Sequence, residues 1–221
     1  MVSTPLEQTV TRHQLLDSLS DDVADSGPTI ITVSGVSGSG KSTIAELLAR
    51  RFNGAYLEAD HTHIGLAKLL ELHGAENHDL IETYDYELVA KLAAELATGN
   101  SVQIPQYDFA TAERTPTLRE IKPRESGVVV VDGLYASELE RVIGDKQRAE
   151  KKLKLKHVFV DTPLYVSVIR RILRDCSLDR DSQTHREVTF SDEGSLAYMV
   201  NTAIPTYLNS DYSRKFDYIA R

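Results

Sequence analysis

Cysteine, long apolar runs and positive charge are all scarce in this chain of 221 residues. Its single cysteine, Cys176, can form no disulfide within the chain and supplies no metal cluster, which is typical of a reducing compartment. No apolar run approaches the roughly 20 residues that a membrane-spanning helix needs, and the N-terminus lacks the pattern of a signal peptide. We therefore expect a cytoplasmic protein with no membrane partner.

The balance of charge is acidic, with 33 Asp and Glu against 25 Lys and Arg and a formal net charge of −8. Nucleic acids and anionic membranes both require a positive surface, so we expect no nucleic-acid partner. One basic run, KQRAEKKLKLK at residues 146–156, stands out. We interpret it as a solvated helix end or loop.

The length favours one sizeable α/β domain over two small ones. Residues 5–26 predict an amphipathic helix around Leu15, Leu16 and Leu19, followed by an acidic linker. We divide the chain into an N-terminal helical appendage and linker at residues 1–28 and one main domain at residues 29–221.

Strands and helices are predicted to alternate through the main domain. A β-branched run at residues 29–34 leads into a glycine-rich turn and then a helix that ends near Phe52. Further strands are predicted at residues 55–58, 128–131, 157–160 and 218–220, a hairpin at 102–109 and 117–122, and helices at 64–73, 84–98, after Thr162-Pro163, and at 196–208. This alternation is typical of an α/β fold with a parallel sheet covered on both faces.

A phosphate-binding loop lies between the first predicted strand and helix. Residues 35–42, GVSGSGKS, match the pattern G-x-x-x-x-G-K-[ST] without a gap. Glycines let successive backbone N–H groups point inward, and the helix that follows adds its positive N-terminal end. The residues expected to hold the phosphates of ATP are Gly35, Ser37, Gly38, Ser39, Gly40, Lys41, Ser42 and Thr43.

A nucleotide held by such a loop also needs a metal ion. Lys41 is expected to neutralise the β- and γ-phosphates, and Ser42 to hold Mg²⁺. Asp132 directly follows the apolar strand VVVV at residues 128–131, so its carboxylate would lie near the loop. We predict Ser42 and Asp132 as the two metal ligands.

The loop alone does not distinguish hydrolysis from transfer. The Asn-Lys-x-Asp segment with which switch GTPases read guanine is absent from the chain. A small-molecule kinase needs a base for the acceptor hydroxyl and arginines for the transferring phosphoryl group. Asp60, after the second strand, is the candidate base, and Arg170, Arg171, Arg174 and, a short step beyond, Arg180 supply the cations. The alternative for these arginines is a surface patch paired with nearby aspartates.

Three segments together resemble the uridine kinase and phosphoribulokinase group of P-loop kinases. They are SGSGKST at residues 37–43, VQIPQYDF at residues 102–109, and VDTP at residues 160–163 followed by the arginines. The resemblance covers the chain from about residue 29 to 220. It implies a nucleoside- and nucleotide-kinase-like P-loop NTPase fold, a three-layer sandwich with an arginine-bearing lid.

The resemblance also implies roles for single residues. Asp60 matches the catalytic base, and Lys41 and Arg174 are expected to stabilise the transferring group. The residues implied on the acceptor side are Asp79 for ribose hydroxyls, Tyr107 and Phe109 for the base, and Arg171, whereas Arg174 and Arg180 match lid arginines that reach ATP. Without the family, Tyr107 and Phe109 would be read as hairpin core.

The departures from the family fall mostly in the acceptor pocket. His63 stands where uridine kinases have Tyr, and His78 stands where they have Phe. The histidine that contacts the pyrimidine is replaced near Ala112, whereas Arg114 is retained. We expect His63 to line the acceptor pocket of an enzyme with a shifted substrate. A metal site at His61 and His63 is the alternative, although no third ligand is fixed by spacing.

The sequence therefore predicts a kinase that uses ATP and Mg²⁺ to phosphorylate a hydroxyl of a small acceptor. A nucleoside such as uridine or cytidine is the first expectation. A pentose phosphate, pantothenate or glycerate is the alternative within the enzyme class, with Arg114, Arg119, Lys122 and Arg124 as extra cations. A nucleotide-binding regulatory protein without activity is the alternative outside it, and the sequence leaves homo-oligomer formation open.

Overall fold

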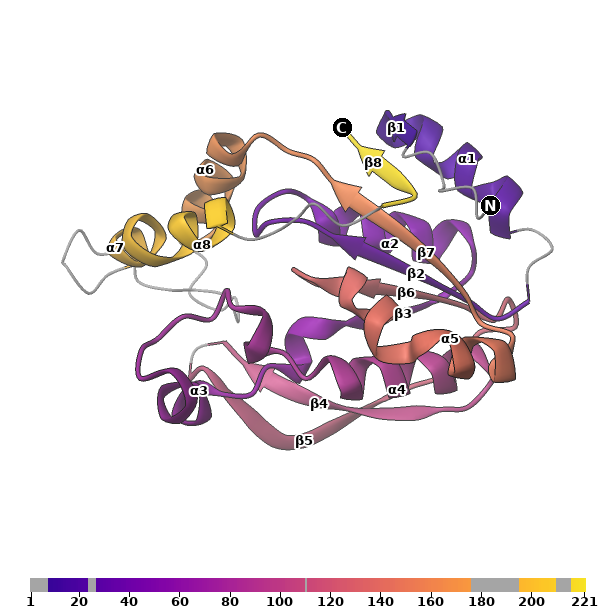
Figure 1. Cartoon of the computed structure of the whole chain (residues 1–221), viewed down its shortest axis with the longest axis horizontal. Helices are drawn as coiled ribbons and strands as arrows, with labels where there is room; N and C mark the ends of the chain where they lie inside the picture. Colours follow the sequence, from indigo (N-terminus) through magenta and orange to yellow (C-terminus); the bar gives the residue numbers. More distant parts are fainter. Residues whose placement is uncertain (1–7, 24–26, 110, 176–194, 210–215) are drawn as a thin grey trace.

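The computed structural model describes residues 8–23, 27–109, 111–175, 195–209 and 216–221. Their centre is a parallel sheet of six strands in the order β1-β8-β7-β2-β6-β3 (Figure 1). These strands are β1 (Gln8–Val10), β2 (Thr29–Ser34), β3 (Ala55–Glu58), β6 (Val128–Asp132), β7 (Lys154–Val160) and β8 (Tyr218–Ala220). β2 and β6 are neighbouring interior strands and are buried throughout, as their continuous apolar runs predict.

Helices cover both faces of the sheet, which confirms the predicted three-layer α/β fold. On one face, α1 (Arg12–Val23) and α2 (Lys41–Arg51) pack over Ile31, Val33 and Val130. On the other face, α4 (Tyr86–Ala97) and α5 (Leu139–Lys151) pack over Ile30 and Val129. In Figure 1, α1 lies above the strands, and α4 and α5 lie below them.

The N-terminal segment contributes to this core. The expected helix is present as α1, and Leu15 and Leu19 are fully buried against the sheet. Residues 8–10 add β1 as an edge strand beside β8, which the sequence did not predict. The reason is that a three-residue strand has little pattern of its own and takes its partner from the far end of the chain. The described part of residues 1–28 is therefore continuous with the main domain.

The remaining elements flank the sheet. The predicted hairpin is present as β4 (Val102–Asp108) and β5 (Glu113–Ile121), and β4 contacts α4. α3 (Leu66–His73) follows a short helix, η1 (Ala59–Thr62). The expected helix at residues 196–208 is α7 (Ser195–Tyr198) and α8 (Ile204–Asn209), joined by a π-helical turn at Met199–Ala203. Together with α6 (Leu164–Asp175), these helices lie beyond the carboxyl end of β7 (Figure 1).

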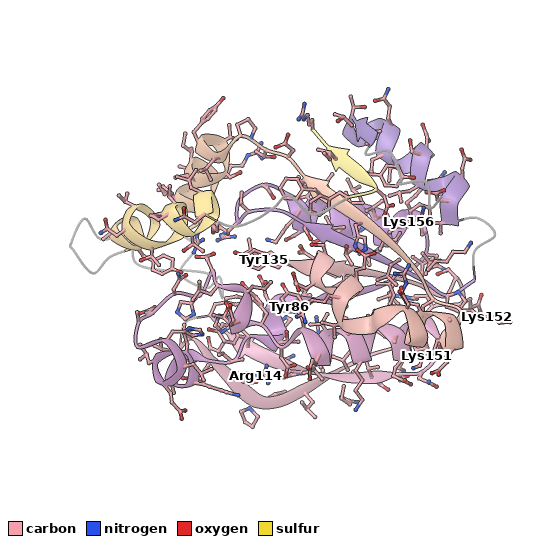
Figure 2. All side chains as sticks on the ribbon, viewed as in Figure 1. Tyr86, Arg114, Tyr135, Lys151, Lys152 and Lys156 are labelled. Carbon is pink, nitrogen blue, oxygen red and sulfur yellow. The ribbon has the colours of Figure 1, made fainter. Side chains whose placement is uncertain are left out.

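The basic run at residues 146–156 lies at the other end of the molecule. Figure 2 shows Lys151, Lys152 and Lys156 on the side away from α6, α7 and α8. Lys151 pairs with Glu95, and Lys156 pairs with Asp22, each at 2.7 Å. Among the described residues, no helix has the length and apolar character needed to cross a membrane.

Candidate active site

The phosphate-binding loop connects β2 to α2. Gly40 has a φ of 94° and Gly38 a φ of 86°, a backbone region that favours glycine. These angles turn the chain so that α2 begins at Lys41, whose side chain is buried at the base of the loop. The Thr162 hydroxyl donates to the backbone oxygen of Ser39 at 2.8 Å, which joins the loop to the segment before α6.

Helix α6 lies directly against this loop. A methyl group added at Gly38 would collide with the backbone oxygen of Ser167 in α6. Only a glycine leaves room for this close approach, so the conformation of the loop and the position of α6 depend on each other.

Asp132 has the surroundings expected of a metal ligand. It pairs with Val33 where β6 lies beside β2, just before the loop. Its Oδ2 accepts a hydrogen bond from Tyr56 at 3.1 Å, whereas its buried Oδ1 has no partner among the described residues. Burial and the charge of Asp60 raise the pKa of Asp132, although Lys41 and Ser42 act to lower it. An orphaned buried carboxylate oxygen beside the Ser42 hydroxyl fits a cation such as Mg²⁺.

One pocket of about 240 Å³ brings most of the predicted residues together. From the sequence predictions it is lined by Ser37, Lys41, Ser42, Asp60, His63, Asp79, Tyr107, Phe109, Arg171 and Arg174. It is also lined by Glu58, His78, Tyr84 and Leu134. Arg180 lies outside the described residues. Arg170 is exposed and does not line the pocket, so the arginines of α6 divide between the pocket and the surface.

Asp60 contributes a carboxylate to the pocket. It lies in η1, directly after β3, where the carboxyl ends of the parallel strands meet. Its side chain is half-buried and has no hydrogen-bond or ion-pair partner among the described residues. The pocket therefore holds an acceptor for a proton on the same side as Lys41 and Ser42.

Asp79, in contrast, is fully engaged by the protein. Arg171 Nη1 lies 3.1 Å from its Oδ1, and the hydroxyls of Tyr207 and Tyr198 donate to Oδ1 and Oδ2, each at 2.7 Å. Burial alone would raise the pKa of Asp79, but the Arg171 charge and the two hydroxyls lower it overall. Asp79 is thus an ionised carboxylate closed in by α6, α7 and α8.

His63 and His78 form a buried pair beside it. His63 Nε2 and His78 Nδ1 lie 3.3 Å apart, and His78 Nε2 lies 2.9 Å from Glu76 Oε1. The Gly65 N–H donates to His63 Nδ1, so His63 carries its proton on Nε2. Burial, together with the neighbouring His78, lowers the pKa of His63 to about 4. His63 is therefore neutral at pH 7.

The metal alternative for His61 and His63 gains no support from these contacts. His61 Nδ1 accepts a hydrogen bond from the Tyr107 N–H at 3.2 Å, and His61 Nε2 faces Glu58 at 3.5 Å. The two rings thus serve different partners. No group of three or more His, Cys, Asp or Glu in the described part of the chain is placed to hold a metal ion.

Aromatic rings form a continuous wall on the acceptor side. The ring of His63 lies 4.9 Å from that of Tyr107, 5.0 Å from that of His78 and 5.3 Å from that of Tyr84, centroid to centroid. Tyr107 also packs edge to face on Phe109 at 5.2 Å. Tyr107 therefore lines the pocket and also packs within the hairpin.

The cations considered for a phosphorylated acceptor are used elsewhere. Arg114 Nε donates to the His63 carbonyl at 2.6 Å and its Nη2 to the Thr62 carbonyl, which fixes the segment after Asp60. Figure 2 shows Arg114 on the hairpin below α4. Arg119 pairs with Glu58 at 3.1 Å. Of the described residues that line the pocket, none is Arg114, Arg119, Lys122 or Arg124.

The strand, loop and helix that carry Lys41 and Ser42, with Asp132 beside them, are those of a P-loop NTPase. The model of the Phosphoribulokinase / Uridine kinase family matches residues 30–186, and the chain belongs to this family. It is 32% identical to a uridine kinase of Clostridium perfringens over 152 residues, and this aligned region covers 67% of the chain and 68% of that protein.

Solved structures of kinases with different names share this fold. A candidate fructose transport system kinase from Silicibacter sp. superimposes with a TM-score of 0.65 at 20% identity, over 95% of this chain and 98% of that one. D-glycerate 3-kinase from Cryptococcus neoformans superimposes with a TM-score of 0.51 at 13% identity, over 74% of this chain and 78% of that one.

Proposed function

We propose that the protein transfers the γ-phosphoryl group of ATP to a hydroxyl of a small acceptor. The observation that carries this proposal is the position of Asp60, an unpartnered carboxylate in one pocket with Lys41 and Ser42. A hydrolytic switch has no need of an acceptor pocket beside its phosphate loop, whereas a kinase does.

The residues divide the reaction between them. The loop amides and Lys41 hold the β- and γ-phosphates, and Ser42 and Asp132 hold the cation. A bound Mg²⁺ supplies neutralising charge to these phosphates. Asp60 accepts the proton of the acceptor hydroxyl while the oxygen of that hydroxyl forms a bond to the γ-phosphorus. The bond between the γ-phosphorus and the β–γ bridging oxygen breaks, and ADP leaves. Arg174, on the pocket side of α6, stabilises the transferring group.

The acceptor is the finer part of the proposal. A nucleoside such as uridine or cytidine follows from the resemblance and from the uridine kinase relative. The structural neighbours carry names for a sugar transport kinase and a glycerate kinase, which support other small acceptors equally well. A regulatory protein without activity has less support, because Lys41, Ser42, Asp60 and Asp132 are all in place.

The test is acceptor-dependent release of ADP. The protein is incubated with Mg-ATP and a panel of nucleosides, neutral sugars, pentose phosphates, pantothenate and glycerate. At least one acceptor is expected to accelerate ADP release well above the rate without acceptor. Tight ATP binding with no acceleration by any acceptor would favour the regulatory alternative, and a preference for GTP would overturn the donor assignment.

A further inference from the structure

The hydroxyl of Tyr84 lies at the acceptor end of the pocket and is not used by the machinery described above. Backbone hydrogen bonds hold this residue beside the Asp60 segment: Ile64 N–H donates to Thr83 O at 2.9 Å, and Asp85 N–H donates to Thr62 O at 3.2 Å. The ring is half-buried and lines the pocket. Its hydroxyl has no hydrogen-bond partner among the residues that the structure describes.

Two carboxylates of the pocket act on this hydroxyl. Burial, followed by the negative charges of Asp60 and Asp79, raises the pKa of Tyr84 well above its usual value. The hydroxyl is therefore a neutral donor near both carboxylates. Asp79 already accepts from Arg171, Tyr198 and Tyr207, and no hydrogen bond joins Tyr84 to Asp60, so the Tyr84 hydroxyl is available to a ligand in the pocket.

The closure of Asp79 disfavours a nucleoside. Ribose hydroxyls could reach this carboxylate only by displacing the phenol of Tyr198 or Tyr207. A displaced phenol in this buried cluster would lose its acceptor, and an unsatisfied buried hydroxyl is costly. Two phenols and a guanidinium thus already occupy the positions at which a vicinal diol would bind.

Three rings on the acceptor side leave little surface against which a base could pack. His63, His78 and Tyr107 have relative exposures of 4%, 7% and 5%, so little of each ring remains to be covered by a ligand. The pocket of about 240 Å³ must also receive the end of the ATP triphosphate, and it is smaller than the roughly 300–1,000 Å³ typical of ligand sites. Both facts favour a compact acceptor.

The charge of the pocket disfavours an anionic acceptor. Arg171 is committed to Asp79, Arg114 to backbone carbonyls and Arg119 to Glu58. These pairs neutralise Asp79 and Glu58, so Asp60 is left, among the described residues, as a carboxylate without a counter-ion at the acceptor end. A phosphorylated or carboxylated acceptor would meet repulsion there, whereas a neutral hydroxyl can donate to Asp60 and accept from Tyr84.

From these contacts we infer that the acceptor is a neutral, base-free sugar or polyol, and that Tyr84 binds one of its hydroxyls beside Asp60. This inference rests on the proposed function and names the substrate class of the same site. Tyr84 is then a specificity-determining residue, since its phenol serves a polyhydroxylated ligand and does little for a flat base.

The experiment compares acceptors and a single-atom variant. Initial rates of ADP release are measured with neutral sugars and polyols (ribose, fructose, glycerol and sorbitol), with uridine and cytidine, and with ribose 5-phosphate and glycerate. We expect turnover with at least one neutral sugar or polyol and little with the other groups. Tyr84→Phe is expected to raise KM for that acceptor about 3- to 10-fold while kcat and the KM for ATP change less. Tyr165→Phe, on the exposed face of α6 at 69% relative exposure, is the matched control.

The outcomes separate this inference from the proposed function. Saturable turnover with uridine or a phosphorylated acceptor, and none with neutral sugars or polyols, keeps the kinase and overturns the inference. An unchanged KM in Tyr84→Phe removes Tyr84 from the site. If no acceptor is turned over, the proposed function fails, and calorimetry with a non-hydrolysable ATP analogue decides the inference. Binding of a neutral sugar or polyol that Tyr84→Phe weakens supports it, and binding of a nucleoside alone, or of none of these ligands, overturns it.

Discussion

Arg171 and Asp79 form a buried ion pair that joins α6 to the floor of the acceptor pocket. Arg171 Nη1 lies 3.1 and 3.2 Å from the two carboxylate oxygens, and both side chains are almost fully buried. Burial alone would lower the pKa of Arg171, but the Asp79 charge raises it overall. The guanidinium also lies over the Tyr198 ring, 5.6 Å from its centroid. The pair therefore fixes the position of the helix that also contacts the phosphate loop.

Removing Arg171 should be costly, because it leaves the Asp79 carboxylate buried without its counter-ion. Arg171→Met is expected to lower the free energy of unfolding by about 3 kcal/mol. This value is at the lower end for a broken buried ion pair, because the hydroxyls of Tyr198 and Tyr207 still donate to Asp79. Urea denaturation at pH 7 measures it. Arg170→Met, on the exposed side of the same helix, should stay within about 0.5 kcal/mol of the wild type. Equal effects of the two variants would show that the pair contributes little.

The buried His63 should make the protein sensitive to mild acid. Its pKa of about 4 in the folded state lies below the usual value near 6.5, so the unfolded chain binds the proton first as the pH falls. The contribution of neutral His63 to stability is fully present above about pH 6.5 and is lost progressively as the pH falls to about 4. Between pH 7 and pH 5, protonation of this histidine in the unfolded chain is expected to lower the free energy of unfolding by about 2 kcal/mol.

Denaturation of the wild type and of His63→Gln at the two pH values measures this cost. The variant lacks the titrating ring, so its free energy of unfolding should fall less between pH 7 and pH 5. An identical pH dependence of the two proteins would contradict the assignment.

The contact between the phosphate loop and α6 predicts an asymmetry between two glycines. Gly38→Ala and Gly74→Ala both place a side chain at positive φ, at 86° and 67°. Nothing lies within 4 Å of a Cβ at Gly74, whereas a Cβ at Gly38 meets the backbone of Ser167. We expect a loss of about 1 kcal/mol for Gly74→Ala and about 2–3 kcal/mol for Gly38→Ala.

Thermal and urea unfolding of both variants test this asymmetry, and ATP titration reports on the loop. Gly38→Ala should also weaken ATP binding, since α6 or the loop must shift. Equal stability losses and normal ATP affinity in both variants would mean that α6 does not depend on the loop.

Local signals in the sequence predicted most of the fold. The loop at residues 35–42 follows from its glycines, and β2 and β6 follow from continuous apolar runs. β1 escaped prediction because its stability comes from β8, with Gln8 paired to Tyr218. No pattern within three residues carries that information.

In the candidate site, too, local signals were predictable and contacts between distant segments were not. Lys41 and Ser42 were predicted from the loop motif and Asp60 from its place after the second strand, and all three lie in one pocket. The closure of Asp79 was not predicted, because it depends on Tyr198 and Tyr207, which lie more than 100 residues away along the chain. Tyr84 lay inside a segment that the family resemblance covered, but its hydroxyl becomes notable only once its lack of a partner is seen.

The central claim is tested most directly by the role of Asp60. Mass spectrometry of the acceptor after incubation with Mg-ATP should detect the phosphorylated product with the wild type and with Asp145→Asn, a variant at an exposed site outside the pocket. Asp60→Asn should lower the rate of product formation at least about 100-fold, as expected for loss of a general base, with ATP affinity nearly unchanged. Product formation at the wild-type rate by Asp60→Asn would contradict the account.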